Sequence, residues 1–365
     1  KLEWLLRDPD TRRRAETGAL AAGTVEAWLV ARLTGGRVHV TDHTNASRTL
    51  LYDLSARTWD TELLDVFGVP RAMLPDLVPS SGFVGEADAE HVGIPLPIAG
   101  LAGDQQSALF GQGCCHSGLA KNTYGTGAFL LVSTGERRPT PPPGVLATAA
   151  CGPHGEPAYA LEGSVFIAGA ALQWLRDGLG LIRSAAESEA LARSVQDTGG
   201  VHFVPAFVGL GTPYWEAEAR GTISGITRGT SRAHLVRAAL EAMAFSSADL
   251  LDAMAGAVGI DVPALRVDGG ASANDWLLQF QADVLGIPVE RPDMVETTAL
   301  GAAGLAGMAL GVWQGPEDFL AGRRFRRFEP TTGPRQQADL RQGWARAVST
   351  ALAWARTGSS ASAGT

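Results

Sequence analysis

Cysteine is rare in this chain of 365 residues, which contains only Cys114, Cys115 and Cys151. An odd number of cysteines, two of them adjacent, does not form the paired framework of a small disulfide-stabilised protein. Their spacing also fits no common metal site. Thiols without a pairing pattern are typical of a reducing compartment, so we expect a cytoplasmic protein.

Long hydrophobic runs are missing as well. The most apolar segment, residues 299–312, is shorter than the roughly 20 residues that a membrane-spanning helix needs. No pattern typical of a secretory signal is visible. We therefore expect no membrane span, and we interpret the apolar segment as a buried helix. Its glycines at positions 301, 304, 307 and 311 are predicted to allow close packing.

An excess of positive charge is also lacking. The formal net charge is −8, which argues against nucleic acid or an anionic membrane surface as the main partner. We interpret the two basic runs, residues 12–14 and 322–328, as solvated surface. A length of 365 residues with 45% hydrophobic residues instead suits a globular protein of two domains.

The chain does not begin with methionine. Its first residue, Lys1, already lies within an amphipathic helical pattern. We interpret this beginning as the sign of a fragment, or of a chain whose first part has been lost.

Short apolar strands alternate with helices through most of the sequence. After helical patterns at residues 1–36 and 61–67, strands are predicted at 98–103, 121–132, 158–163, 201–205, 264–268 and 288–291. Helices are predicted at 168–178, 232–256, 273–285 and 297–311. This alternation indicates an α/β fold with a largely parallel or mixed sheet. The small residues 357–365 are expected to form a disordered tail.

The strand predicted at residues 98–103 leads into Asp104 and then into a helical pattern. Ligands collect at the carboxyl ends of strands in α/β sheets, and a carboxylate there can take a proton from an attacking hydroxyl. Residue type alone favours the alternative, a helix cap for Asp104.

Two glycines, Gly125 and Gly127, flank Thr126 between two strand-like runs. Backbone N–H groups and the threonine hydroxyl of such a tight turn can point at phosphate oxygens. Many hairpins use the same residues for structural reasons only.

Two further stretches place glycine at the start of a predicted helix. Gly169 opens one of them, and the amide of Gln173 lies one turn further on, where it can bind an adenine or ribose edge or simply face solvent. In the other, a strand ends at a double glycine that includes Gly270, with Ser272 and Asn274 available as caps or ligands. Neither stretch is a Walker A loop or a G-x-G-x-x-G fingerprint.

These stretches occur in one order that resembles the sugar-kinase family of glycerol, xylulose and gluconate kinases. The segments 36–48, 103–106, 121–127 and 204–215 are most similar to the glycerol kinases of that family, and the resemblance covers roughly residues 1–350. It implies an actin-like, ribonuclease H-like ATPase fold, in which two α/β domains with mixed sheets surround a nucleotide cleft. The first domain is expected to be incomplete.

The resemblance also implies an activity, namely ATP-dependent phosphorylation of glycerol to sn-glycerol 3-phosphate with ATP and Mg²⁺. It makes Asp104 the general base and a glycerol ligand, places Gln105 on the polyol and packs Phe129 against its carbon backbone. The positions that match nucleotide contacts of the family are Thr126, Gly127, Gly169, Gln173, Gly270 and Asn274.

Several motifs of the family have no counterpart in this sequence. The family opens with an Asp-x-Gly-Thr-Thr turn that grips phosphate and Mg²⁺, and an Arg-Glu pair, a Trp and a Tyr complete its glycerol pocket. No metal ligand is therefore assigned, and we expect the 365-residue chain alone to release no ADP in response to glycerol. Bacterial relatives bind the inhibitor fructose 1,6-bisphosphate through a Gly-Gly-x-Arg loop. The matching residues 91–95 contain no arginine, so we expect this control to be absent.

The expected division is a remainder of the substrate-binding domain at residues 1–112, a nucleotide-binding domain at 113–350, and a helix end with a flexible tail at 351–365. The resemblance gives glycerol and ATP as partners and a dimer or tetramer for the full-length protein. Two alternatives stay open: a kinase for another polyol or sugar of the same family, and a non-catalytic nucleotide-binding fragment.

Overall fold

The structure is a computed structural model that describes residues 1–359. Its last helix, α14 (Pro334–Ser359), includes residues 357–359, which the sequence predicted to belong to a disordered tail. The remainder of that predicted tail, residues 360–365, lies outside the described residues.

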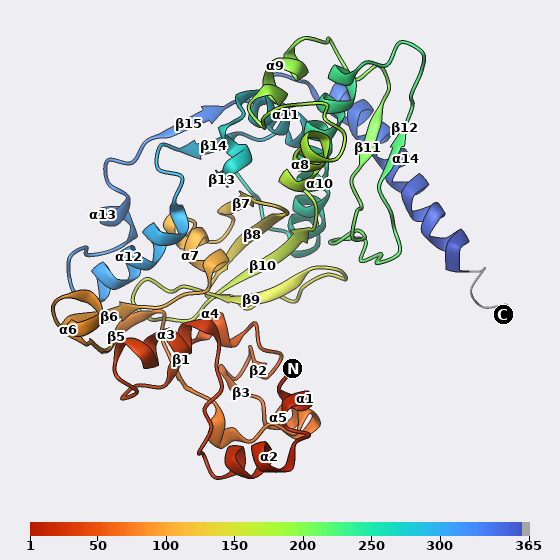
Figure 1. Ribbon diagram of the computed structural model, residues 1–365. Coiled ribbons are helices and arrows are strands. Elements are labelled where there is room, and N and C mark those ends of the chain that lie inside the picture. Colours follow the sequence, from red (N-terminus) through yellow and green to blue (C-terminus); the bar gives the residue numbers. More distant parts are fainter. Residues whose placement is uncertain (360–365) are drawn as a thin grey trace.

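A seven-stranded mixed sheet forms the centre of the molecule (Figure 1). Its strand order is β15-β14-β13-β7-β8-β10-β9. The strands are β7 (Ala120–Tyr124), β8 (Ala128–Gly135), β9 (Leu146–Ala150), β10 (Ala158–Val165), β13 (Leu265–Gly269), β14 (Val289–Pro292) and β15 (Phe325–Phe328). Strand β13 runs parallel to β7 and β14, and the other pairs are antiparallel. The mixed sheet that the sequence predicted is confirmed.

Strand β7 shows how the sequence assigns the two faces of this sheet. Successive side chains of a strand point to opposite faces. On one face, Asn122 and Tyr124 bond to Ser247 of helix α10 (Arg232–Val258). On the other face, Lys121 bonds to a residue of helix α7 (Asp104–Gly111). The two sides of the sheet are thus covered by different helices, and we call the side with α7 the cleft face.

Several helices lie on the side of the sheet opposite α7. They are α8 (Gly169–Asp177), α9 (Glu187–Arg193), α10, α11 (Asp275–Leu285) and α14. The central helix α10 contacts β8, β10, α8, α9 and α11, and many of its side chains, such as those of Ala244 and Leu250, lie in the main hydrophobic core. Close by are the short strands β11 (His202–Val204) and β12 (Thr222–Ser224).

Helix α12 (Thr297–Ala309) packs on α7 almost backbone to backbone. A Cβ atom added at Gly301 would lie 1.9 Å from the carbonyl oxygen of Ser107, and one added at Gly111 would lie 1.9 Å from that of Thr297. Only glycine permits this approach. The packing role predicted for the glycines of the apolar helix is confirmed at Gly301. The short helix α13 (Pro316–Leu320) follows α12.

The N-terminal part of the chain forms a smaller body on the cleft side (Figure 1). Its helices are α1 (Leu2–Leu5), α2 (Pro9–Glu16), α3 (Val25–Leu33), α4 (His43–Ala46), α5 (Thr61–Phe67) and α6 (Ala89–Val92). Its strands are β1 (Val40–Asp42), β2 (Tyr52–Asp53), β3 (Thr58–Trp59), β4 (Asp76–Val78), β5 (Ser81–Ala87) and β6 (Leu96–Gly100). The hairpin of β5 and β6 packs on α12 and leads directly into α7.

Candidate active site

Asp104 is the first residue of α7, directly after the loop that follows β6. The residue before it, Gly103, occupies the N-cap position, so the alternative that Asp104 caps this helix is wrong. The Asp104 side chain is exposed, and its Oδ1 accepts the backbone N–H of Gln105 at 2.8 Å. A carboxylate with open lone pairs therefore stands at the start of α7. The strand before it, β6, ends at Gly100 and belongs to the β5–β6 hairpin, so the prediction that Asp104 directly follows a strand of the main sheet is wrong.

A buried polar cluster fixes the backbone just before Asp104. The hydroxyl of Thr44 accepts the N–H of Gly103 at 2.7 Å and donates to the Asp42 carboxylate at 2.7 Å. Ser80 also donates to Asp42, at 2.6 Å. Because Thr44 and Asp42 are both fully buried, this cluster leaves the loop before Asp104 little freedom.

Glu26 of helix α3 lies next to Asp42 in the same cluster. Its Oε1 accepts the backbone N–H of Asp42 at 2.9 Å and the hydroxyl of Thr41 at 3.0 Å. Burial, followed by the charge of Asp42, raises the pKa of Glu26 to about 8. Near neutral pH Glu26 is therefore protonated for the most part.

Gln105 connects Asp104 to the cleft face of the sheet. Its side-chain Nε2 donates to Asp104 Oδ2 at 3.3 Å, and its Oε1 accepts from the ammonium group of Lys121. Lys121 also donates to the hydroxyl of Thr123 at 2.9 Å. In the strand register Thr123 stands opposite Phe129, which is half-buried on the same face. The three residues predicted to bind the polyol are thus linked through β7.

A cavity of about 580 Å³ lies on the other side of the hairpin turn that joins β7 and β8. Five of the six predicted nucleotide residues line it, namely Thr126, Gly169, Gln173, Gly270 and Asn274. They come from the hairpin turn, from α8 and from the segment between β13 and α11. Segments distant in the sequence therefore meet at one cavity, as a single ligand site requires.

The amino end of α8 is joined to the hairpin turn by its backbone. The N–H of Gly169 donates to the carbonyl of Gly125 at 3.0 Å, and the N–H groups of Ala168 and Ala170 donate to that of Thr126 at 2.8 and 3.1 Å. A Cβ atom at Gly169 would lie 2.6 Å from the Gly125 oxygen. Glycine is required here by the contact between two backbones, and the same contact keeps the cavity wall in place.

Gly127 is the predicted nucleotide residue that the cavity lining does not include. A Cβ atom there would lie 2.3 Å from the carbonyl oxygen of Val165. The structure therefore gives Gly127 a packing role between the hairpin and β10. Its contact with phosphate stays a prediction.

The double glycine after β13 combines strain and open space. Gly269 has a φ of +81°, and a Cβ atom there would lie 2.2 Å from the backbone carbonyl oxygen of Tyr124. A Cβ atom at Gly270 would meet no atom within 4 Å. Asn274 accepts the backbone N–H of Leu277 at 2.9 Å and so caps α11, while it also lines the cavity. The sequence left cap and ligand open for Asn274, and its position is compatible with both.

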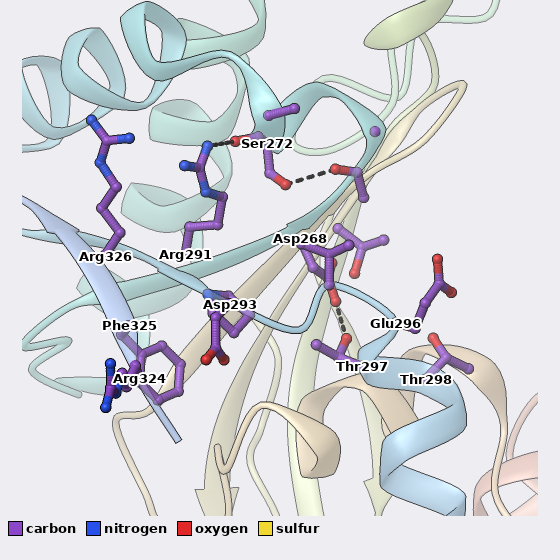
Figure 2. Close-up of a pocket in the computed structure, with 16 residues that line it drawn as sticks. Asp268, Ser272, Arg291, Asp293, Glu296, Thr297, Thr298, Arg324, Phe325 and Arg326 are labelled. Atoms are coloured by element: carbon purple, nitrogen blue, oxygen red, sulfur yellow. Dashed lines mark hydrogen bonds between the residues drawn. The ribbon is translucent and has the colours of Figure 1, made fainter. Parts of the chain in front are cut away.

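A second, larger cavity of about 890 Å³ adjoins the first and shares Gly270 and Ala273 with it. It is lined by Asp268, which is buried and accepts the hydroxyl of Thr297 (Figure 2). Within residues 1–359, the other oxygen of Asp268 has no hydrogen-bond partner. Asp268 stands opposite Thr123 in the sheet register, so this cavity borders the cleft face near the polyol residues.

The sequence matches both halves of one enzyme family. Residues 1–111 match the N-terminal domain of the FGGY family of carbohydrate kinases, and residues 120–310 match its C-terminal domain. The chain belongs to the FGGY family of carbohydrate kinases.

Relatives of this FGGY kinase include a protein named glycerol kinase from Carboxydothermus hydrogenoformans. The two are 55% identical over 357 residues, which cover 97% of this chain and 71% of that protein. A second relative is the glycerol kinase of Thermus thermophilus, which is 52% identical over 97% of this chain and 72% of its own length. These relatives make the protein a phosphotransferase.

Solved structures show the same fold. A Plasmodium falciparum glycerol kinase with ADP has a TM-score of 0.90 and 36% identity, over 96% of this chain and 71% of that chain. A Lactobacillus acidophilus xylulose kinase has a TM-score of 0.83 at 23% identity, over 97% and 71% of the two chains. The actin-like, two-domain sugar-kinase fold that the sequence indicated is therefore confirmed.

The described part of this FGGY kinase, residues 1–359, contains no helix that is long and apolar enough to cross a membrane. No group of three or more His, Cys, Asp or Glu side chains in that range could hold a metal ion. These side chains therefore do not fit a Mg²⁺ site made by protein ligands alone.

Sequence reasoning missed one functional candidate of this FGGY kinase, Lys121. The sequence does carry a signal for it, since Lys121 is the first residue of a strand predicted to be apolar. Lysine is seldom fully buried, so this position should have drawn attention.

Proposed function

We propose that this kinase transfers the γ-phosphoryl group of ATP to a terminal hydroxyl of glycerol and forms sn-glycerol 3-phosphate. The observation that carries the proposal is the 55% identity, over 97% of the chain, to a protein named glycerol kinase. The arrangement of Asp104, Gln105 and Phe129 around β7 supports it, because it offers a carboxylate, an amide and an apolar ring to a small polyol.

ATP is proposed to bind in the cavity between the hairpin turn, α8 and the double glycine. The volume of about 580 Å³ suits the nucleoside part of the molecule. Glycines at positions 125, 169 and 270 bring backbone groups to the wall without side chains in between. The related Plasmodium falciparum enzyme was solved with ADP, which supports the same ligand class here.

Asp104 is proposed to act as the general base of the transfer. As the glycerol oxygen forms its bond to the γ-phosphorus, Asp104 takes the proton of that hydroxyl, and the bond from γ-phosphorus to the bridging oxygen breaks to release ADP. The fixed loop before Asp104 and the two hydrogen bonds from Gln105 orient the carboxylate for this step. Such fixed orientation is the main contribution that a protein makes to phosphoryl transfer.

Mg²⁺ is proposed to accompany ATP rather than to occupy a site built by this chain. Magnesium in kinases is held largely by the phosphate oxygens and water, with one or two protein carboxylates. This arrangement is compatible with the lack of a three-ligand cluster among residues 1–359. No step above is assigned to the metal.

The cellular setting and the assembly are further proposals. The three free cysteines are buried or half-buried, and burial raises the pKa of Cys114 and Cys115 to about 12, which suits a protein of the reducing cytoplasm. A dimer or tetramer is proposed for the full-length protein, and light scattering after gel filtration would measure it. We also keep the proposed division into domains at residues 1–112 and 113–350.

A substrate profile of the purified full-length protein tests the proposed activity. ADP release with ATP would be measured in the presence of glycerol, erythritol, xylulose and gluconate. We expect glycerol to give the highest kcat/KM of the four. A higher value for another acceptor would show that this compound, and not glycerol, is the preferred substrate. ATP binding without any transfer would indicate a non-catalytic nucleotide-binding protein.

Replacement of Asp104 tests the role of the base. We expect Asp104→Ala to lower kcat by about 10²- to 10⁴-fold, because a general base contributes roughly that factor. The affinity for ATP, measured by calorimetry, should stay within about a factor of 3, since Asp104 does not line the nucleotide cavity. A wild-type kcat in the variant would remove Asp104 from the mechanism.

A further inference from the structure

Lys121 is a buried cation in the central sheet. Its side chain has no exposure to solvent, and its strand neighbours Ala120 and Asn122 are buried as well. Lysine is also rare in this chain: of its 30 lysines and arginines, only Lys1 and Lys121 are lysines. A buried ammonium group reduces stability unless it is paired, so an apolar side chain would serve folding better at this position.

The hydrogen bonds of Lys121 determine how Gln105 is oriented. An ammonium group has three donors and no acceptor, so it can contact only the oxygen of the Gln105 amide. With the oxygen on Lys121, the amide nitrogen is turned toward Asp104, where it donates to Oδ2 at 3.3 Å. The remaining bond of Lys121, to Thr123 Oγ1 at 2.9 Å, anchors the ammonium group to the same strand.

The charge of Lys121 has carboxylates around it but none in direct contact. Within residues 1–359, no carboxylate oxygen lies within ion-pair distance of its Nζ. The groups that face it are Asp268 from β13, Glu162 from β10, Asp104 from α7, and the thiol of Cys114. Burial lowers the pKa of Lys121 to about 8, against the opposing effect of these carboxylates. The ammonium form is therefore present at neutral pH and is lost as the pH rises through 8.

We propose that Lys121 is a positioning residue for the phosphoryl transfer, which orients the Asp104 carboxylate through the side-chain amide of Gln105. The proposal rests on the proposed kinase function of Asp104. Lys121 does not contact the reacting atoms in this scheme. It fixes the amide, the amide holds Oδ2, the backbone N–H of Gln105 holds Oδ1, and the remaining lone pairs of the carboxylate face the substrate. Without the ammonium group the amide is free to turn its oxygen toward Asp104, where two acceptors would repel each other.

The kinetic test compares Lys121→Met with the wild type and repeats the comparison in a Gln105→Ala background. We expect Lys121→Met to lower kcat about 10- to 100-fold while the KM for ATP is unchanged, because a small misorientation of a reacting group has effects of this size. In the Gln105→Ala background the same replacement should change kcat less than about 3-fold, since the two residues act through one contact. A wild-type kcat in Lys121→Met, or an equal loss in both backgrounds, would overturn the proposal.

The pH dependence of kcat distinguishes this positioning role from a purely structural one. In the wild type kcat should fall as the pH rises through 8, as Lys121 loses its proton and its preference for the amide oxygen. In Lys121→Met this alkaline decrease should be absent and the activity low throughout. An identical alkaline decrease in both proteins would contradict the assignment.

A measurement without substrate keeps the proposal testable whatever the acceptor proves to be. In protein labelled with ¹³C-lysine, this chain contributes only two side-chain signals, and Lys121→Met or, if it does not fold, Lys1→Arg assigns them. We expect the Lys121 signal to titrate near pH 8 in the wild type. It should titrate at lower pH in Asp104→Asn, because a carboxylate that favours the ammonium form has been removed.

The same midpoint in the wild type and in Asp104→Asn would show that the two groups are not coupled and would overturn the proposal. If the wild type does not phosphorylate glycerol, the proposed function fails, and the titration still decides the link between Lys121 and Asp104.

Discussion

Glu26 shows how a residue outside the cleft can influence the position of the catalytic carboxylate. It borders Asp42, which holds Thr44, which in turn accepts the N–H of Gly103. Two buried carboxyl groups in contact repel when both are charged, and the raised pKa of Glu26 removes that repulsion near neutral pH. The loop before Asp104 therefore depends on a proton that Glu26 retains in the folded protein.

This proton predicts a pH dependence of stability. The pKa of Glu26 rises from 4.5 to about 8 on folding, so between these values the folded protein binds a proton that the unfolded chain has released. The contribution of Glu26 to stability therefore falls as the pH rises through this window, by at most about 1.4 kcal/mol per pH unit. Glu26→Gln lacks this proton. Urea unfolding at pH 5, 7 and 9 should show that the free energy of unfolding of the variant increases relative to that of the wild type as the pH rises.

An exposed carboxylate provides the matched control for this prediction. Glu62→Gln removes the same charge from the surface of α5. Its difference from the wild type should vary much less between pH 5 and 9. Parallel stability curves for Glu26→Gln and the wild type would contradict the presence of a retained proton.

The contact between helix α8 and the hairpin turn leads to a prediction about two glycines. In Gly169→Ala the new methyl group meets the backbone oxygen of Gly125, which has no room to move, so we expect a loss of stability of about 1–3 kcal/mol. In Gly270→Ala the methyl group enters open space in the cavity wall, so stability should be kept while ADP binds more weakly. Thermal unfolding and calorimetric titration with ADP would measure the two effects.

Gly256 of helix α10 serves as the control for this pair. It is exposed and also has open space around it, but it lies outside the cavity lining. Gly256→Ala should therefore leave the affinity for ADP unchanged. An ADP affinity of Gly270→Ala equal to that of the wild type would place the nucleotide elsewhere.

The elements predicted from the sequence are those with a strong local pattern. The helix predicted at residues 232–256 is observed at Arg232–Val258, and the strand predicted at 288–291 is observed at Val289–Pro292. Strand β9 was missed because residues of low strand propensity such as alanine dominate it, and its pairing with β10 decides its conformation. Strand β15 was missed because its two central arginines made it resemble a solvated basic run.

The positions of the candidate residues were predictable where a glycine or a carboxylate opens a helical segment. Asp104, Gly169 and Gly270 follow this rule, and the structure places each at the first residue of a helical segment. Lys121 was not predictable in the same way, because its burial results from α7 packing over β7, a contact between distant segments. The structural role of Gly127 likewise depends on the approach of β10, which no local pattern indicates.

At the scale of the whole molecule, an ion pair joins the N-terminal body to the central sheet. Arg48, just after α4, donates two hydrogen bonds of 2.7 Å to Glu162 on β10. Glu162 is almost completely buried, whereas Arg48 is partly exposed. Next to this pair, Ser47 and Thr148 are hydrogen-bonded at 3.1 Å. These polar contacts therefore hold the cleft face against the N-terminal body, and Glu162 is the more buried of the two charged groups that take part.

Removal of Arg48 should be costly because it leaves that charge without its partner. A buried carboxylate that loses its partner typically destabilises a protein by about 3–5 kcal/mol, so we expect Arg48→Met to lower the free energy of unfolding by that amount in urea. Adding Glu162→Gln should recover most of the loss, since the buried charge is then gone. As a control, Arg7→Met breaks the exposed pair with Glu3 and should cost less than about 1 kcal/mol. If Arg48→Met is as stable as Arg7→Met, the two bodies are held together by apolar and backbone contacts, and the ion pair contributes only to their alignment.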